Sequence, residues 1–365
     1  MQRIGKILGM IALWLFVIGF VVFFQGRAKH HMATTPIKKL SVVITDSLRD
    51  EMLISTEAVE RWVKASKIPT IGVIMREADL TGIEKAIRNN GFIDRASAYL
   101  TYDGELRIEV SQRRPSLRLR MDGYDCYSTA EGFVFPAPKM ASVYVPVVTG
   151  SYRPPVPNDY VGNVGDYISK LKEASNERIA QLQLEKKPLF EMRDTISARD
   201  RAERRRRISK GIFETHDNFD RRVAELKAEK TKNRRHLRYL DRENDKKIDA
   251  ITARQEAEYE KQKKLQKRYE DFLKLINFVK YIENDSFWSA EIVQIIASEM
   301  SSGDIELELV PRTGRHTILF GEIARVEEKL DDLMMFYQKG LSRIGWDEFR
   351  TISIKYKGQV VCTKY

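Results

Sequence analysis

The sequence predicts an α+β protein with a single N-terminal transmembrane helix, a small β-α-α-β-β domain, and a β domain interrupted by a long charged helical arm. Three observations predict this fold class. The chain contains one unbroken apolar run, strand-type alternation occurs in two separate regions, and nearly half of the residues between those regions are charged. The expected parts are a short tail, a membrane helix, a first domain, the first part of a β domain, the arm, and the second part of the β domain: residues 1–6, 7–24, 37–114, 115–165, 166–270 and 271–365.

The apolar run from Ile7 to Phe24 is long enough to cross a membrane. Its 18 residues reach about 27 Å as a helix, close to the hydrocarbon thickness of a bilayer. A cleaved signal peptide is the alternative, because basic residues precede the run and residues 26–28 offer a small-x-small cleavage site. The length of the run, and Trp14 within it, favour an uncleaved anchor. Basic residues flank both ends of the run, so charge counting leaves its orientation open.

The first soluble block reads as strand, helix, helix, strand, strand. Ser55 and Asp79 are N-cap residues that predict the starts of the two helices. Leu106, Ile108 and Val110 alternate with polar residues, which is typical of a half-buried strand. The preceding dipeptide 103–104 (Asp-Gly) predicts a two-residue hairpin turn to a partner strand over 93–101.

The second block is rich in strands on both sides of the charged region. We expect strands near 117–121, 132–136 and 143–148 before it, and strands at 305–310 and 317–320 after it. Residues 273–296 read as two helices with a bend at 287–288, and 322–337 as an amphipathic helix. A last hairpin is expected over Thr351 to Thr363, with its turn at Lys357-Gly358.

The region 166–270 differs in composition from the rest of the chain. It holds 30 Lys and Arg against 21 Asp and Glu, and therefore carries most of the net charge of +11. Some helical spacing of apolar residues survives, with Pro188 and Gly211 as the expected interruptions. A solvated helical arm or a partly disordered insert is one interpretation. An anion-binding surface centred on the run Arg204, Arg205, Arg206 and Arg207 is the other.

The sequence offers no catalytic or metal-binding constellation. Its five histidines lack ligand spacing, and no phosphate-binding glycine loop or nucleophile motif occurs. Cys126 and Cys362 allow at most one disulfide and no metal cluster. We therefore predict a protein without enzymatic activity, cofactor or bound metal.

Several short segments, taken in order behind one anchor, resemble the FtsQ/DivIB family of cell division proteins. The strand-helix-helix-strand-strand block resembles that family's POTRA domain. The segments that carry the rest of the resemblance are residues 112–115 (Gln-Arg-Arg-Pro), 130–135, 145–150, 318–321 followed by Lys329-Leu330, and 352–356 (Ile-Ser-Ile-Lys-Tyr). The family's usual chain has no arm of this length, so the resemblance leaves the arm unexplained.

The resemblance implies a divisome scaffold that binds FtsB and FtsL and helps to control septal peptidoglycan synthesis. It also implies a cytoplasmic tail, a single-pass helix in the inner membrane, and a periplasmic body at the division septum. In that compartment the arm does not meet nucleic acid. Two other classes remain open: a POTRA-containing envelope assembly or translocation factor, and a cytoplasm-facing coiled-coil protein that binds nucleic acid through its arginines.

The resemblance places the partner contact on the C-terminal hairpin. The positions that match the family's contact are Lys355, Tyr356 and Gly358, and Tyr365 stands near the family's terminal aromatic residue. Such a hairpin can accept an extended partner segment as an added strand. In the alternative interpretation, Tyr356 caps the core of the domain and has no partner.

Overall fold

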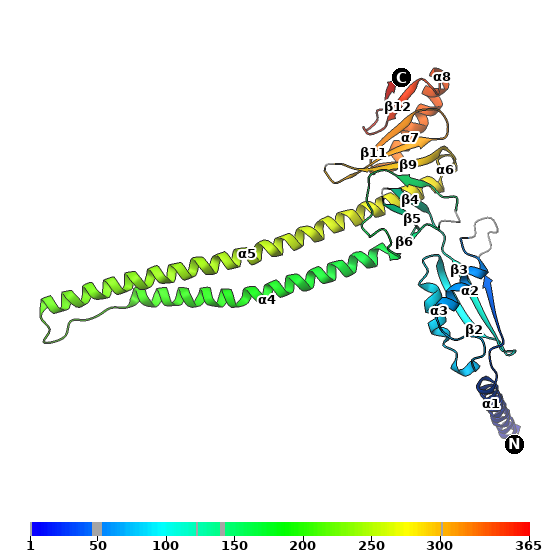
Figure 1. The fold of residues 1–365 in the computed structure, drawn as a ribbon, viewed down its shortest axis with the longest axis horizontal. Helices are drawn as coiled ribbons and strands as arrows, with labels where there is room; N and C mark the ends of the chain where they lie inside the picture. The colour runs from blue at the N-terminus through cyan, green and yellow to red at the C-terminus, as the bar shows by residue number, and fades with distance from the viewer. Residues whose placement is uncertain (1, 46–52, 122, 139–142, 301) are drawn as a thin grey trace. The chain divides into compact units, whose positions relative to one another are not determined.

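The computed structural model describes residues 2–45, 53–121, 123–138, 143–300 and 302–365, with side chains from residue 14 onward (Figure 1). The chain divides into two compact units. One consists of Met1–Asn163 together with Leu273–Tyr365, and the other is Val164–Phe272. The second unit falls within about two residues of the arm expected from the charge distribution.

The chain begins with helix α1, Gln2–Thr34. This helix contains the apolar run, of which the side chains of residues 7–13 lie outside the described part. From Trp14 to Phe24 the side chains are exposed. Over the described part of the chain, no helix is both long and apolar enough to span a bilayer.

The first block has the predicted element order. It contains β1 (Lys39–Ile44), α2 (Thr56–Ala65), a short 3-10 turn (Met75–Glu77), α3 (Leu80–Arg88), β2 (Ile93–Leu100) and β3 (Glu105–Gln112). The sheet order is β1-β3-β2, with β1 parallel to β3. Both predicted N-caps are present: Ser55 accepts the amide hydrogen of Ala58, and Asp79 accepts that of Gly82. The buried face of the sheet packs against α2 and α3.

The predicted two-residue turn between β2 and β3 is wrong. The Thr101 amide donates to the Glu105 carbonyl at 2.9 Å, so the loop holds three residues, 102–104. Within this loop Gly104 alone has a positive φ, 82°. A two-residue turn would require a positive φ at Asp103 as well as at Gly104. The longer loop requires a positive φ only at the glycine, which adopts it without strain.

The described strands of the second block form one ten-stranded sheet in the order β13-β12-β11-β10-β9-β7-β4-β5-β6-β8. Before the arm, the strands are β4 (Leu117–Met121), β5 (Tyr124–Ser128), β6 (Phe133–Pro136), β7 (Val147–Thr149) and β8 (Gly162–Asn163). After it come β9 (Ile292–Glu299), β10 (Ile305–Pro311), β11 (Thr317–Glu322), β12 (Phe349–Ser353) and β13 (Val361–Lys364). The two halves of the chain meet where β7 pairs with β9 in parallel.

Gly150 follows β7 at a point where the backbone of β9 leaves no room for a side chain. Its φ is 114°, and a Cβ at this position would lie 2.2 Å from the carbonyl oxygen of Ala297 on β9. No side chain fits such an approach, so the central joint of the sheet requires glycine here.

Two helices predicted in the second block have different bounds. α5 ends at Asn284, and a single turn, α6 (Trp288–Glu291), precedes β9. Residues 292–296 form a strand because their backbone pairs with β10 on one side and, over 294–296, with β7 on the other. Their β-branched side chains favour this conformation. The amphipathic helix α7 covers Val326–Phe336, and a π-turn (Tyr337–Leu341) and a short helix α8 (Ser342–Ile344) follow it.

The second block contributes to the core of the first. Phe135 on β6 is fully buried and belongs to the same apolar cluster as the residues of α2 and α3. Its ring meets Phe92 edge to face at 5.6 Å and Tyr127 at 5.8 Å. A Cβ on Gly91 would lie 2.5 Å from the Phe135 Cβ. The two blocks therefore share one core rather than meeting across an exposed linker.

The arm is a pair of long helices, α4 (Val164–Arg205) and α5 (His216–Asn284), that run side by side (Figure 1). Polar contacts join them in antiparallel order: Ser175 bonds Glu258, the Leu189 carbonyl accepts from Asn244 at 2.8 Å, and Arg234 meets Asp200 at 3.0 Å. Pro188 lies inside α4 and does not end it. The first unit holds the last turns of α5, where Phe278 packs on Phe320 of β11.

Candidate functional site

One end of the ten-stranded sheet is the C-terminal hairpin. Strand β13 pairs antiparallel with β12, with Thr363 opposite Thr351 and Val361 opposite Ser353. On its other side, β13 pairs with no strand in the described part of the chain. Val361 is 47% exposed on this strand. An open strand of this kind presents unpaired backbone N–H and C=O groups that another chain can complete.

The four residues expected at a partner contact lie on or beside this hairpin. Lys355, Tyr356 and Gly358 belong to the loop between β12 and β13, and Tyr365 follows β13. The side chain of Tyr356 is 62% exposed, so the alternative in which it caps the core of the domain is wrong. Gly358 has a φ of 63° and open space around it. Tyr365 is exposed and its hydroxyl donates to the carbonyl of Arg315 at 3.0 Å.

Lys355 already has a partner within the chain. Its ammonium forms a short ion pair with Glu306 of β10, and its side chain lies across Gly321 at the end of β11. Any acidic group of a partner protein would have to compete with Glu306 for this lysine. The sequence did not indicate this pair, because the two residues are far apart along the chain.

A buried lysine, named in the sequence only as part of the segment Lys329-Leu330, holds α7 against β11. Lys329 is 3% exposed, and its Nζ donates to the carbonyls of Phe320 at 2.9 Å and Glu322 at 2.8 Å. Burial lowers its pKa. The signal in the sequence is its position one turn after Val326 and next to Leu330, on the apolar face of the helix. Lys329 therefore holds the end of β11 in place on both sides of Gly321, the glycine against which the Lys355 side chain lies.

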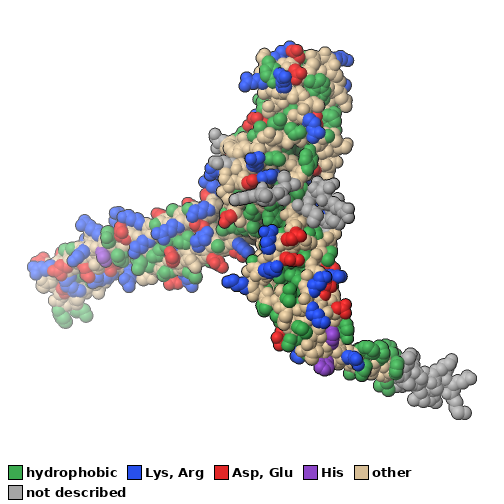
Figure 2. Space-filling view, turned by 45° about the vertical axis from the view of Figure 1, so that its right-hand side comes forward, with side chains coloured by type: hydrophobic (Ala, Val, Ile, Leu, Met, Phe, Trp, Pro, Cys, Tyr) green, Lys and Arg blue, Asp and Glu red, His purple; other side chains and the backbone are tan. Residues whose placement is uncertain are grey.

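The four arginines proposed as an anionic-surface contact lie at the end of α4 and just beyond it. Arg204 pairs with Asp200 at 2.7 Å, and Arg206 pairs with Glu229 at 2.9 Å, so both are held within the arm. Arg205 and Arg207 are exposed. Figure 2 shows Lys and Arg side chains along the arm, with a hydrophobic group at its end. The run of four therefore offers two arginines to a partner rather than four.

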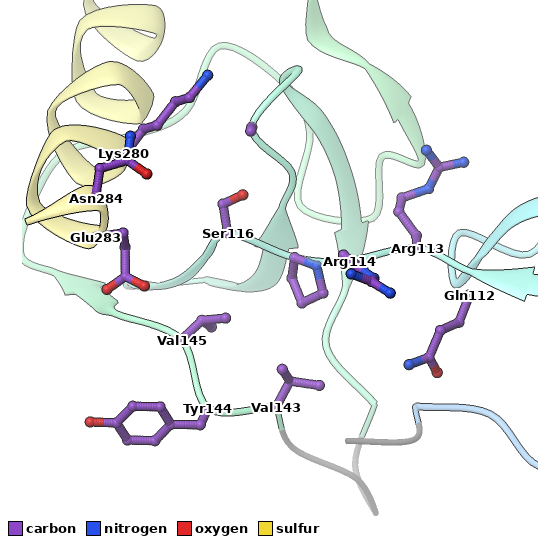
Figure 3. A pocket seen from close by; sticks show the side chains of 12 residues that line it. Gln112, Arg113, Arg114, Ser116, Val143, Tyr144, Val145, Lys280, Glu283 and Asn284 are labelled. Carbon is purple, nitrogen blue, oxygen red and sulfur yellow. The ribbon is translucent and has the colours of Figure 1, made fainter. Parts of the chain in front are cut away.

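A cavity of about 440 Å³ lies beside the segment that joins the two blocks (Figure 3). Its lining includes Arg114, Ser116, Tyr144, Lys280 and Glu283. Burial raises the pKa of Glu283. The wall combines one acidic and three basic side chains with polar and apolar residues.

The second residue of the resembling junction 112–115 has a structural role. The guanidinium of Arg113 donates to the carbonyls of Gly91 at 3.2 Å and Ile93 at 2.9 Å, and it pairs with Asp94 at 3.2 Å. It also lies 3.6 Å from the ring centroid of Phe133. Arg113 thus ties the start of β2 to β6 across the join between the blocks.

The buried titratable groups of the described residues include His316 and Cys126. No group of His, Cys, Asp and Glu there could hold a metal ion. His316 is buried against the hydroxyl of Tyr337 at 3.0 Å, and burial lowers its pKa. Cys126 and Cys362 are both free thiols, so the one disulfide that the sequence allowed is not formed.

Two family models match the chain. A POTRA-like domain model matches residues 36–111, which covers the β-α-α-β-β block except for the last residue of β3. A model described as FtsQ/DivIB, C-terminal related, matches residues 239–363, from within α5 to the last strand. No curated protein matches the chain significantly.

POTRA-like domains and FtsQ/DivIB-related domains are typically non-enzymatic scaffolds. The second match relates the C-terminal part of the chain to FtsQ/DivIB and so suggests a cell division protein. Together the two matches support the resemblance to FtsQ/DivIB proteins that the order of the segments indicated.

Proposed function

We propose that the protein is a membrane-anchored scaffold of the division machinery that binds FtsB- and FtsL-like proteins by strand addition at β13. The position of β13 at the open end of the sheet carries the proposal. A partner segment in extended conformation would complete the backbone hydrogen bonds of that strand. Binding there would link the partners to this scaffold and so help to control septal peptidoglycan synthesis.

The proposed location is the inner membrane, with residues 1–6 in the cytoplasm and the body in the periplasm at the septum. Support comes from the apolar run of 7–24 and from the match to the FtsQ/DivIB-related model. Eleven of these residues, 14–24, have exposed side chains on α1. A row of exposed apolar side chains is costly in water and stable in lipid.

The exposed groups around β13 suit a partner strand. Tyr356 offers a large side chain at the rim of the hairpin, and Val361 offers an apolar contact on the strand itself. Aromatic residues of this kind often carry a large share of the binding free energy at an interface. Gly358 leaves space in which a partner backbone could approach closely.

The proposal is tested by replacing Tyr356 with alanine in the full chain and measuring affinity for peptides from the extended regions of FtsB- and FtsL-like partners. We expect a loss of about 30-fold or more, the size of an aromatic hot spot. The melting temperature should stay near that of the parent, because the side chain is exposed. Tyr239→Ala is the matched control, since that tyrosine is 60% exposed on the arm.

Lys355 needs a second pair of variants, because it is bound to Glu306. Lys355→Glu breaks that ion pair, whereas Lys355→Glu combined with Glu306→Lys restores it with the charges exchanged. If Lys355 binds an acidic partner residue, both variants lose affinity. Recovery of affinity in the double variant would assign the lysine to the fold. Unchanged affinity in Tyr356→Ala would exclude this end of the sheet as the site.

A further inference from the structure

The connection between α4 and α5 is an ordered turn with apolar residues at its corner. The amide of Glu214 donates to the carbonyl of Gly211 at 3.2 Å, so Ile212 and Phe213 occupy the two central positions of a β-turn. The Glu214 carboxylate accepts from the Gly211 amide at 2.9 Å and pairs with Arg222 of α5 at 2.7 Å. The turn is therefore fixed to the second helix by its own side chain.

The two corner residues are almost fully exposed. Ile212 is 96% exposed and Phe213 is 99% exposed. Central turn positions are normally occupied by Gly, Pro, Asn, Asp or Ser, whose conformational preferences suit them. Ile and Phe contribute nothing to the turn and find no packing within it. Two adjacent apolar side chains held outward at the end of a helical hairpin need an external apolar environment.

The surroundings of this corner are basic. Between Arg199 and Glu214 the chain has seven Lys and Arg against three Asp and Glu. In the described part of the arm, no carboxylate forms an ion pair with Arg205 or Arg207, and Lys210 acts on the Glu214 carboxylate only as the smallest of the causes that lower its pKa. Lys230 of α5 donates to the carbonyls of Arg204 and Arg206, which fixes the backbone from which Arg205 and Arg207 project. The corner thus combines an apolar pair with unpaired positive charge.

We propose that this turn, which we call the arm tip (residues 205–214), docks on an anionic phospholipid surface. Ile212 and Phe213 insert at the boundary between headgroups and acyl chains, while Arg205, Arg207 and Lys210 contact lipid phosphates. Apolar side chains flanked by basic residues are the pattern of segments that bind such interfaces.

A lipid surface fits the arm tip better than a protein partner. The tip is convex and only a few residues long, so it offers far less than the roughly 800 Å² per partner that a stable protein interface buries. A bilayer deforms around a convex apolar group, and its anionic headgroups match the charge. The phosphates of a nucleic acid would pair with the arginines, but the isoleucine and the phenylalanine would remain exposed to water.

The inference is tested on the full-length chain held in phosphatidylcholine nanodiscs. The apolar N-terminal helix is inserted in the nanodisc, so that it does not itself bind the added vesicles. Co-sedimentation is measured with added vesicles of mixed phosphatidylglycerol and phosphatidylcholine, and with vesicles of phosphatidylcholine alone. We expect binding to the mixed vesicles, weaker at higher salt. Ile212→Ser with Phe213→Ser should weaken binding at least about tenfold. Arg205→Gln with Arg207→Gln should weaken it about tenfold and reduce the salt dependence.

Two control variants change the same kinds of side chain elsewhere on the arm. Leu184→Ser removes an apolar side chain that is 71% exposed, and Lys263→Gln with Lys264→Gln removes two exposed charges. Both should bind vesicles as the parent does. Equal binding by tip and control variants would overturn the inference, as would equal binding to both kinds of vesicle. Tip-dependent self-association without vesicle binding would assign the tip to a second copy of the chain and refute lipid docking.

Discussion

Replacing Phe135 with alanine should destabilise both blocks of the first unit at once. The side chain is fully buried and its ring contacts Phe92 and Tyr127. Truncation of a buried phenylalanine costs about 3–5 kcal/mol, because the surrounding side chains close the cavity only in part. In a unit of this size such a loss lowers the melting temperature by roughly 6 to 20 °C. Since Phe135 lies in the core of the first block while belonging to a strand of the second, the two blocks should begin to unfold separately.

The assay is calorimetry of the full chain together with urea unfolding monitored by tryptophan fluorescence. The chain has four tryptophans, so the assay uses variants that keep only Trp62, in the first block, or only Trp288, in the second, to report on different parts of the unit. Phe213→Ala is the control, because that ring is 99% exposed and its loss should change the free energy of unfolding by less than about 0.5 kcal/mol. If Phe135→Ala is as mild as this control, the shared core is not a source of stability.

Two further predictions concern the buried histidine and the arm. Burial lowers the pKa of His316, against smaller opposing effects of the Trp346 backbone and Asp347, so the unfolded chain binds a proton more readily than the folded one. The free energy of unfolding should therefore fall as pH drops through about 6.5, and His316→Gln should flatten that slope; an unchanged slope would contradict this assignment. Replacing residues 167–269 by a short Gly/Ser linker should leave the thermal transition of the first unit near the parent's, because the arm forms its own compact unit. Loss of a cooperative transition in that variant would show that the arm is needed for the fold.

Local signals in the sequence predicted the first block well. The caps at Ser55 and Asp79 and the alternation along β3 depend on residues close together in the chain, so short windows contain the needed information. Residues 292–296 were predicted as helix for the opposite reason. Their spacing fits either structure, and only the pairing with β7, far away in the sequence, selects the strand.

The candidate contact residues likewise include some features that nearby sequence predicts and others that depend on distant residues. The exposure of Tyr356 follows from its place in a loop, but the bond between Lys355 and Glu306 joins positions on different strands. The arginine run was evident from composition, whereas its division into paired and unpaired members depends on which helix face each residue occupies. The apolar corner at Ile212 and Phe213 was overlooked, because two apolar residues in a charged segment form no periodic pattern.

The pairing of β7 with β9 has a consequence for the order in which the protein can fold during synthesis. Val147 lies beside Gln294 at the centre of the sheet, and the Gln294 amide donates to the Thr149 hydroxyl at 2.8 Å. A ribosome needs roughly 6 to 26 s to add the stretch 164–291 between these strands. Throughout that interval β7 lacks its neighbour, while α4 and α5 can form at once from local contacts. The nascent chain therefore waits with an open strand in the middle of its future sheet, a period in which a chaperone that covers extended segments would prevent mispairing.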